Sequence, residues 1–205
     1  MEASFPTNEE IGQTVALKEW ASAIMAFRRG ETILALRKGG IREETRDFQL
    51  KSDSFYFLPA YEHQKPHLVK ERYRHYVEQS KADWNPERPV VFISARAEVA
   101  EDILIYDADA LKAVSHLHIW TDAYAEERLR WKRTKPLHGL LLRVYNLREP
   151  IPVEVTPAFA GCKSWVDLRM PPPSGSAGFP GETPALPDDR FAQAVQAVKS
   201  ALENR

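Results

Sequence analysis

The sequence contains a single cysteine, Cys162, among its 205 residues. One cysteine forms no disulfide within the chain, and it excludes a metal site built from several thiolates. Such sparse use of cysteine is typical of a reducing compartment. The first residues, MEASFPTNEEIGQ, are acidic and lack the basic and then apolar layout of a secretion signal. We therefore expect a cytoplasmic protein.

Long uncharged apolar runs are also missing, so the sequence predicts no membrane-spanning segment and no membrane partner. Neither the phosphate-binding pattern of P-loop proteins nor the glycine fingerprint of dinucleotide-binding folds occurs. The formal net charge of -1 excludes a wholly basic nucleic-acid wrapper. It is compatible with a local cationic face, because binding depends on how the charge is distributed. The sequence singles out no cofactor.

Hydrophobic residues make up 43% of the chain, which is enough for a well-packed core. Helix and strand patterns alternate without the regular rhythm of a parallel α/β fold, so we predict a single α+β domain over residues 1–169. Its sheet is expected to be mixed or antiparallel, with interspersed helices. Helices are expected over 17–29, 66–81, 108–113 and 122–133, and strands over 32–36, 46–51, 55–58, 90–93, 103–106, 116–120, 140–145, 153–155 and 164–168.

Local signals mark several of these boundaries. The side chains of Asp107 and Thr121 are expected to cap helix N-termini, and Pro66 is suited to the first position of a helix. Gly30 suits the left-handed position after a helix.

After the domain, residues 170–187 are rich in proline, glycine and serine and predict a flexible linker. Residues 188–205 then form an amphipathic helix. Its apolar stripe needs a surface to cover it. We favour docking on the chain's own domain, and a protein partner is the alternative.

The stretch RKGGI places Arg37 and Lys38 beside Gly39 and Gly40. Glycines at these positions suit a tight hairpin turn, whereas a phosphate cradle normally lies before a helix N-terminus. Because another strand pattern follows, the hairpin is favoured. Arg37 and Lys38 can still bind a phosphate from outside the turn.

The stretch EHQKPH spaces two histidines four apart, as in some helical metal sites. Pro66 lies between them and is incompatible with one continuous helix there, so a helical metal site is disfavoured. What remains is a polar loop after a strand. Glu62 and His63 are its candidate acid–base residues, and Gln64 is a candidate binding residue.

Two weaker patterns have structural interpretations that are favoured over functional ones. His116 and His118 alternate on an expected strand, where a structural pair is favoured over a metal site. Asp47, Gln49 and Lys51 resemble the acidic and lysine pattern of restriction-type nucleases, but Gln49 replaces a carboxylate that a hard cation needs.

A cluster of cations at the end of the helix expected over 122–133 suits nucleic-acid phosphates, with Trp131 available for stacking. The alternative is that these cations only complement the negative helix C-terminus. The predicted binding residues of this cluster are Arg128, Arg130, Lys132 and Arg133.

Several segments together resemble a known family: LKEWASAIMAFRRGETILALRKGGI, FYFLPAYEHQKPHLVK, SHLHIWT, KPLHGLLLRVYNL and FAGCKSWVDL. They are similar to the bacterial family called domain of unknown function 1802, from about Leu17 to Leu168, with the linker and last helix outside it. The resemblance implies no established activity. It does imply an association with DNA restriction or defence, because some members are fused to a restriction-type endonuclease domain.

Three functions stay open. The leading hypothesis is an accessory module that contacts DNA or RNA. The second is an enzyme, a hydrolase or a metal-dependent nuclease, that uses Glu62 and His63 as acid–base residues or metal ligands. The third is a protein-interaction module that uses the terminal helix. If the RKGGI turn and the EHQ loop lie at the same edge of the sheet, Arg37, Lys38, Glu62 and His63 would form one polar pocket.

Overall fold

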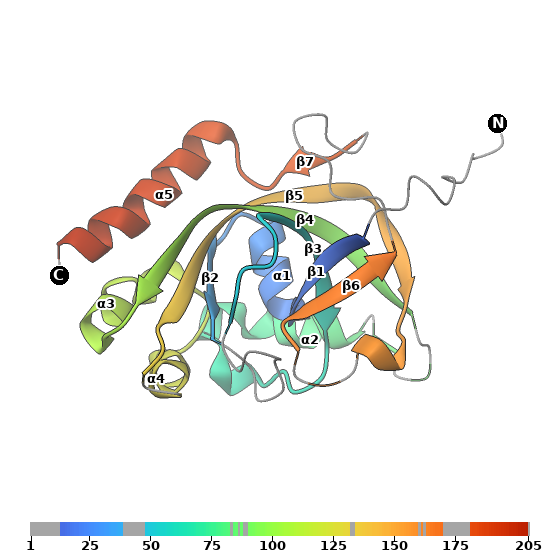
Figure 1. Ribbon diagram of the computed structural model, residues 1–205, viewed down its shortest axis with the longest axis horizontal. Coiled ribbons are helices and arrows are strands. Elements are labelled where there is room, and N and C mark those ends of the chain that lie inside the picture. The colour runs from blue at the N-terminus through green and yellow to red at the C-terminus, as the bar shows by residue number, and fades with distance from the viewer. Residues whose placement is uncertain are drawn as a thin grey trace.

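The sheet is built around two long strands, β4 (Val90–Ile105) and β5 (Leu137–Glu154), which pair with each other in antiparallel direction. The computed structural model describes residues 13–38, 48–82, 84–85, 87, 90–131, 134–159, 161, 163–169 and 181–204. Within these ranges the strand order is β2-β5-β4-β3-β1-β6, with β7 added beside β5. The sheet curls into a half-barrel with α1 inside its concave side (Figure 1). The α+β prediction is confirmed.

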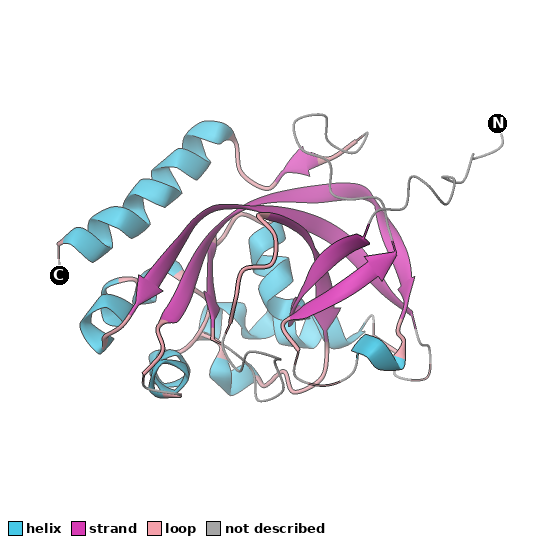
Figure 2. Cartoon of the chain, viewed as in Figure 1, coloured by secondary structure: helices cyan, strands magenta, loops and turns pink. Residues whose placement is uncertain are grey.

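The other strands are shorter: β1 (Gln13–Trp20), β2 (Leu34–Arg37), β3 (Ser54–Ala60), β6 (Trp165–Arg169) and β7 (Thr183–Pro184). Figure 2 shows how the helices lie around this sheet. The helices are α1 (Ala21–Arg28), α2 (Arg74–Ala82), α3 (Ala108–Ala113), α4 (Asp122–Arg130) and α5 (Asp188–Glu203). Short 3-10 turns are η1 (Pro66–Leu68), η2 (Glu71–Tyr73), η3 (Ser115–Leu117) and η4 (Pro157–Phe159).

The sequence predicted four short strands where the structure has β4 and β5. Register shifts interrupt their pairing between Ile93 and Ala95 and between Val99 and Glu101. Such bulges bend and twist a strand without ending it. They let two long strands follow the curve of the half-barrel, and they break the alternation that a sequence pattern depends on.

The first predicted helix is wrong up to Trp20. Residues Gln13–Trp20 form β1, which lies between β3 in parallel and β6 in antiparallel pairing. Ala16 and Leu17 are both fully buried, since each face of this central strand is covered. Apolar residues on both faces hide the two-residue period. The helix itself begins directly at Ala21, and Gly30 has the left-handed backbone that was predicted (φ 67°).

Two predicted strands are also wrong. Residues 48–51 belong to no strand, and residues 46–47 lie outside the described ranges. Residues 116–120 form the η3 turn and a single bridge between Trp120 and Val69. His116 is exposed and His118 fully buried, so the two histidines do not share a strand face.

The caps predicted at Asp107 and Thr121 are confirmed. The Asp107 carboxylate accepts a hydrogen bond from the Ala110 N–H at 2.8 Å. The Thr121 hydroxyl accepts one from the Tyr124 N–H at 3.4 Å. Pro66 is the first residue of η1. These signals depend on neighbouring residues only, which is why the sequence located them.

The last helix, α5, packs on the chain's own domain. Its apolar stripe contacts the main core cluster through Phe191, Ala194, Val195, Val198 and Leu202. An ion pair joins Asp188 to Arg143, and another joins Lys199 to Glu101 at 2.6 Å. The stripe is therefore covered by the domain, and the structure gives no support to a protein partner docked on it.

Part of the predicted linker contacts the domain as well. Thr183 and Pro184 form β7 against β5, and Ala185 and Leu186 pack on the core. Residues 170–180 lie outside the described ranges. No helix in the described residues is long and apolar enough to span a membrane.

Candidate functional site

A pocket of about 250 Å³ opens where the two edges of the curled sheet approach each other. We call it the basic pocket. It is lined by Lys18, Glu19, Trp20, Leu36, Arg37, Lys38, Ala60, Glu62, His63, Trp120, Tyr124, Ala125, Arg128, Gly161, Lys163 and Ser164. It thus gathers Arg37, Lys38, Glu62 and His63, the four residues that were expected to meet if their segments lie at one edge.

The pairing of β1 with β3 explains one side of this pocket. The two strands are parallel, so their carboxyl ends lie at the same edge, with Trp20 beside Ala60. The loop after β3 therefore starts next to the end of β1. Glu62 and His63, on that loop, come to lie near Glu19, which the chain alone would not bring close.

The curl of the sheet supplies the other side. Arg37, at the end of β2, donates hydrogen bonds to the Glu19 carboxylate at 3.0 Å and to the Ser164 hydroxyl at 2.9 Å. The Arg37 side chain is 11% exposed and that of Glu19 is 5% exposed. This nearly buried ion pair joins β2 to the β1–β6 edge of the sheet and fixes one guanidinium in the wall of the pocket.

Helix α4 is tied to the end of β2 by two further hydrogen bonds. Lys38 is buried, and its ammonium donates a hydrogen bond to the Leu129 carbonyl in the last turn of α4. The Arg128 guanidinium donates to the Lys38 carbonyl at 3.3 Å. Carbonyls in the last turn of a helix have no partner within the helix, and a lysine satisfies one of them here. Lys38 and Arg128 are therefore held beside each other in the pocket lining.

Three aromatic rings form a wall of the basic pocket. The Trp20 and Trp120 ring centres are 5.0 Å apart and edge to face. Tyr124 lies 6.1 Å from Trp20, nearly parallel to it, and 5.2 Å from Trp120. Burial in this cluster raises the pKa of Tyr124, so its hydroxyl stays neutral at physiological pH.

The loop that carries Glu62 and His63 is anchored by the residue that follows them. Gln64 is 4% exposed. Its amide oxygen accepts from the Ser22 N–H at 2.9 Å, and its amide nitrogen donates to the Ser80 hydroxyl at 3.2 Å. Gln64 does not line the basic pocket. Its predicted role as a binding residue stays untested, and its observed contacts hold the loop against α1 and α2.

Glu62 and His63 are exposed and line the pocket. His63 has a left-handed backbone, with φ of 63°. Residues other than glycine adopt this conformation at a cost of about 1–3 kcal/mol, and such residues concentrate at functional sites. Among the described residues, no three histidine, cysteine or acidic side chains are grouped so that they could hold a metal ion.

Positive charge dominates the lining, although the whole chain has a formal net charge of -1. The basic side chains of the described lining are Lys18, Arg37, Lys38, Arg128 and Lys163, and the carboxylates are Glu19 and Glu62. Glu19 is already engaged by Arg37. The pocket is therefore suited to an anion.

Other predicted binding residues lie elsewhere. Arg130 is exposed outside the lining and pairs with Glu126 at 2.8 Å. Four more lie outside the described residues: Gly39, Gly40, Lys132 and Arg133.

Sequence reasoning missed the contribution of β1 to the pocket. Lys18, Glu19 and Trp20 were assigned to a helix, where charged side chains usually face solvent. The signal that could have located these residues is the pair of adjacent charged residues, Lys18 and Glu19, inside a segment that is largely buried. Lys163 and Ser164, just before β6, were not among the predicted binding residues.

A family model matches residues 16–197, which is most of the chain. The chain belongs to this family. Its description is Domain of unknown function (DUF1802). The resemblance seen in the sequence is thereby confirmed. The prediction that the linker and last helix lie outside the DUF1802 match is wrong, because the match continues into α5.

No curated protein matches the chain. A solved structure with some likeness is the crystal structure of a serine-to-alanine mutant of ZmASCH from Zymomonas mobilis. The two sequences are 12% identical, the match covers 89% of this chain and 94% of that chain, and the TM-score is 0.40. At this level of likeness, nothing about the function of this DUF1802 protein follows from that structure.

Proposed function

We propose that the basic pocket binds one nucleotide of a single-stranded nucleic acid. The observation that carries this proposal is the joint lining of one pocket by basic side chains and by Trp20, Trp120 and Tyr124. Cations bind phosphate, and aromatic rings stack on bases. The two kinds of group together match the two chemically different halves of a nucleotide.

The cations divide into two groups by their contacts. Arg37 is ion-paired with Glu19, and Lys38 donates to the Leu129 carbonyl, so both side chains are fixed in the wall of the pocket. Lys163 is exposed at the pocket and Arg128 is half-buried there. These two are the side chains that we expect to reach a phosphate directly.

A single strand fits this geometry better than a duplex does. A base can enter a pocket only when its faces and edges are free of stacking and pairing. A duplex binder instead needs a broad basic surface along the backbone, which a chain of net charge -1 does not favour.

The test is binding of labelled single-stranded DNA and RNA of about ten nucleotides, followed by fluorescence anisotropy. With two phosphate contacts, from Lys163 and Arg128, the affinity should fall about sevenfold between about 50 and about 200 mM salt. An affinity that does not change with salt would contradict the proposal. Duplexes of the same sequence serve as the control and should bind more weakly.

An enzymatic role for Glu62 and His63 is the second candidate, and the left-handed backbone of His63 favours it. Both side chains lie beside the proposed phosphate site, where they could move protons during cleavage of a phosphodiester. The test is incubation of the protein with labelled single-stranded RNA. Cleavage that Glu62→Gln abolishes would support the role, whereas intact RNA after prolonged incubation would exclude it.

We also propose a cytoplasmic location, supported by the single cysteine, and an accessory role in restriction or defence. The accessory role is supported by the association with DNA restriction or defence that membership of DUF1802 implies. Its test is plasmid transformation into cells with and without the intact gene. Equal efficiency for foreign and native plasmids in both strains would count against a role in defence.

A further inference from the structure

A second pocket, of about 190 Å³, adjoins the basic pocket. We call it the aromatic pocket. Its lining comprises Lys18, Leu58, Pro59, Ala60, Tyr61, Glu62, Trp84, Val91, Val155, Phe159 and Gly161. Four of these residues, Lys18, Ala60, Glu62 and Gly161, also line the basic pocket. The two pockets therefore share one wall, and a single ligand can occupy both.

The aromatic pocket contains a stacked pair of rings. Tyr61 and Trp84 have ring centres 5.6 Å apart and planes only 6° from parallel, and both residues are half-buried. Leu58, Val91 and Phe159 add apolar surface. An apolar pocket lined by a stacked pair of rings suits a planar aromatic ligand, and such stacking tolerates any base.

A cation lies in the shared wall between the two pockets. The Lys18 ammonium donates hydrogen bonds to the Phe159 carbonyl at 3.0 Å and to the Gly161 carbonyl at 3.1 Å. An ammonium has three N–H donors, so these two bonds, the ones that Lys18 makes within the described part of the chain, leave one for an anion. A charge at this place suits the phosphate that links two nucleotides, because the bases on either side of it would lie in different pockets.

From these observations we infer that the aromatic pocket is a second base site. The ligand is then a single strand of at least two nucleotides, with one base in each pocket and the linking phosphate at Lys18. This inference rests on the proposed function and adds to it the length of the ligand and the path of the strand. It also explains why two pockets of different chemistry meet at one lysine.

The experiment compares three short ligands at low salt: a 5′-phosphorylated mononucleotide, the dinucleotide, and a dinucleotide whose second sugar carries no base. Binding is measured by calorimetry, in the deoxyribose and ribose series, so that DNA and RNA are distinguished. The second base should increase the affinity about tenfold, as expected for one stacked base. The ligand without the second base should lack most of this gain.

Variants then assign the gain to the aromatic pocket. Trp84→Leu and Tyr61→Leu should each remove most of the tenfold gain and leave mononucleotide affinity unchanged. Trp84→Phe retains a ring and should keep most of the gain, which separates stacking from a general loss of structure. Tyr106→Leu is the matched control, because Tyr106 is 68% exposed and lines neither pocket.

The outcomes separate the two proposals. If mononucleotides and longer strands bind with salt dependence, but the second base or Trp84 adds no affinity, the second base site is overturned and the proposed function stands. If no strand of any length binds, the proposed function falls and the second site with it. If an apolar peptide, and no dinucleotide, binds in a manner that Trp84→Leu abolishes, the pocket serves a protein ligand and the inference is wrong.

Discussion

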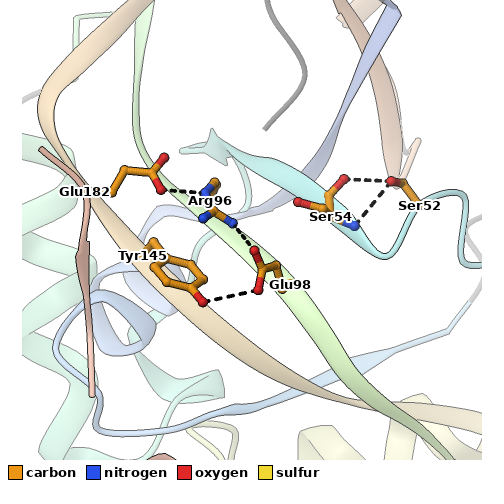
Figure 3. Close-up of polar contacts among 6 residues, drawn as sticks. All are labelled: Ser52, Ser54, Arg96, Glu98, Tyr145 and Glu182. Carbon is orange, nitrogen blue, oxygen red and sulfur yellow. Dashed lines mark hydrogen bonds and ion pairs between the residues drawn. The ribbon is translucent and has the colours of Figure 1, made fainter. Parts of the chain in front are cut away.

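The basic pocket and the cluster around Arg96 use similar residues for opposite purposes. Arg96 is 3% exposed and pairs with Glu182 at 2.8 Å and with Glu98 at 2.6 Å. Its guanidinium lies 4.0 Å from the centre of the Tyr145 ring, and the Tyr145 hydroxyl donates to Glu98 at 3.2 Å (Figure 3). One cation here faces two carboxylates.

The Arg96 cluster and the basic pocket differ in charge balance, and this difference distinguishes a structural role from a binding role. Around Arg96, two carboxylates neutralise the cation. One of them, Glu182, lies directly before β7, so its ion pair with Arg96 holds the segment that leads into β7 against β4. In the basic pocket the described cations outnumber the carboxylates, and Lys163 is exposed. A buried cation that is fully paired holds elements together, whereas an excess of cations in a pocket leaves charge for a ligand.

The largest expected effect comes from breaking the Arg96 cluster. Arg96→Met leaves the buried Glu182 carboxylate without its partner, so we expect a loss of about 3 kcal/mol in the free energy of unfolding. Urea denaturation measures it. Nucleotide affinity of the folded protein should stay unchanged. Glu98→Gln should cost less, because the Glu98 side chain is 37% exposed. A loss below about 1 kcal/mol for Arg96→Met would contradict a structural role.

His118 is a fully buried base, and burial lowers its pKa more than the nearby Asp122 carboxylate raises it. Burial, together with the nearby charge of Lys70, lowers the pKa of His118 from 6.5 to about 3. Between these values the unfolded chain binds a proton that folded His118 does not bind, so stability falls as the pH falls from neutral towards pH 3. His118 alone should account for about 2 kcal/mol of the stability lost between about pH 7 and about pH 5.

Urea denaturation at the two pH values tests this prediction. The variant His118→Gln should lose about 2 kcal/mol less stability than the wild type on acidification. His116→Gln is the matched control, because His116 is exposed, and it should behave as the wild type does. If both variants lose as much as the wild type, His118 is not the group responsible.

A smaller effect is expected at the rim of the basic pocket. Lys163→Gln removes an exposed cation, so affinity for a single strand should fall about fivefold and the salt slope by about 1. The free energy of unfolding should change by less than about 0.5 kcal/mol, as for other surface substitutions. Anisotropy titrations at several salt concentrations measure both quantities. An unchanged slope would remove Lys163 from the phosphate site.

The smallest effect sharpens the comparison between cations inside and outside the pocket. Arg130 is exposed like Lys163, but it lies outside the lining and pairs with Glu126. We expect Arg130→Gln to change strand affinity by less than about twofold, because exposed pairs contribute little. The same titrations apply. A loss equal to that of Lys163→Gln would show that the binding surface extends along α4.

The sequence located parts of the fold to the residue and missed others completely. Asp107 and Thr121 cap helices as predicted, since a cap requires only the next three residues. The strand β1 was mistaken for helix, because a central strand with both faces buried shows no alternation. In the site, Arg37, Lys38, Glu62, His63 and Arg128 were candidates before their positions were known.

The residues alone determined the class of the fold, the caps and the chemical types available for a site. Only the tertiary structure decided which of them meet. Arg37 is 18 residues from Glu19 and 127 residues from Ser164 along the chain, yet it bonds to both. The curl of the sheet brings them together, and that curl results from bulges and pairings between distant strands that no local pattern encodes.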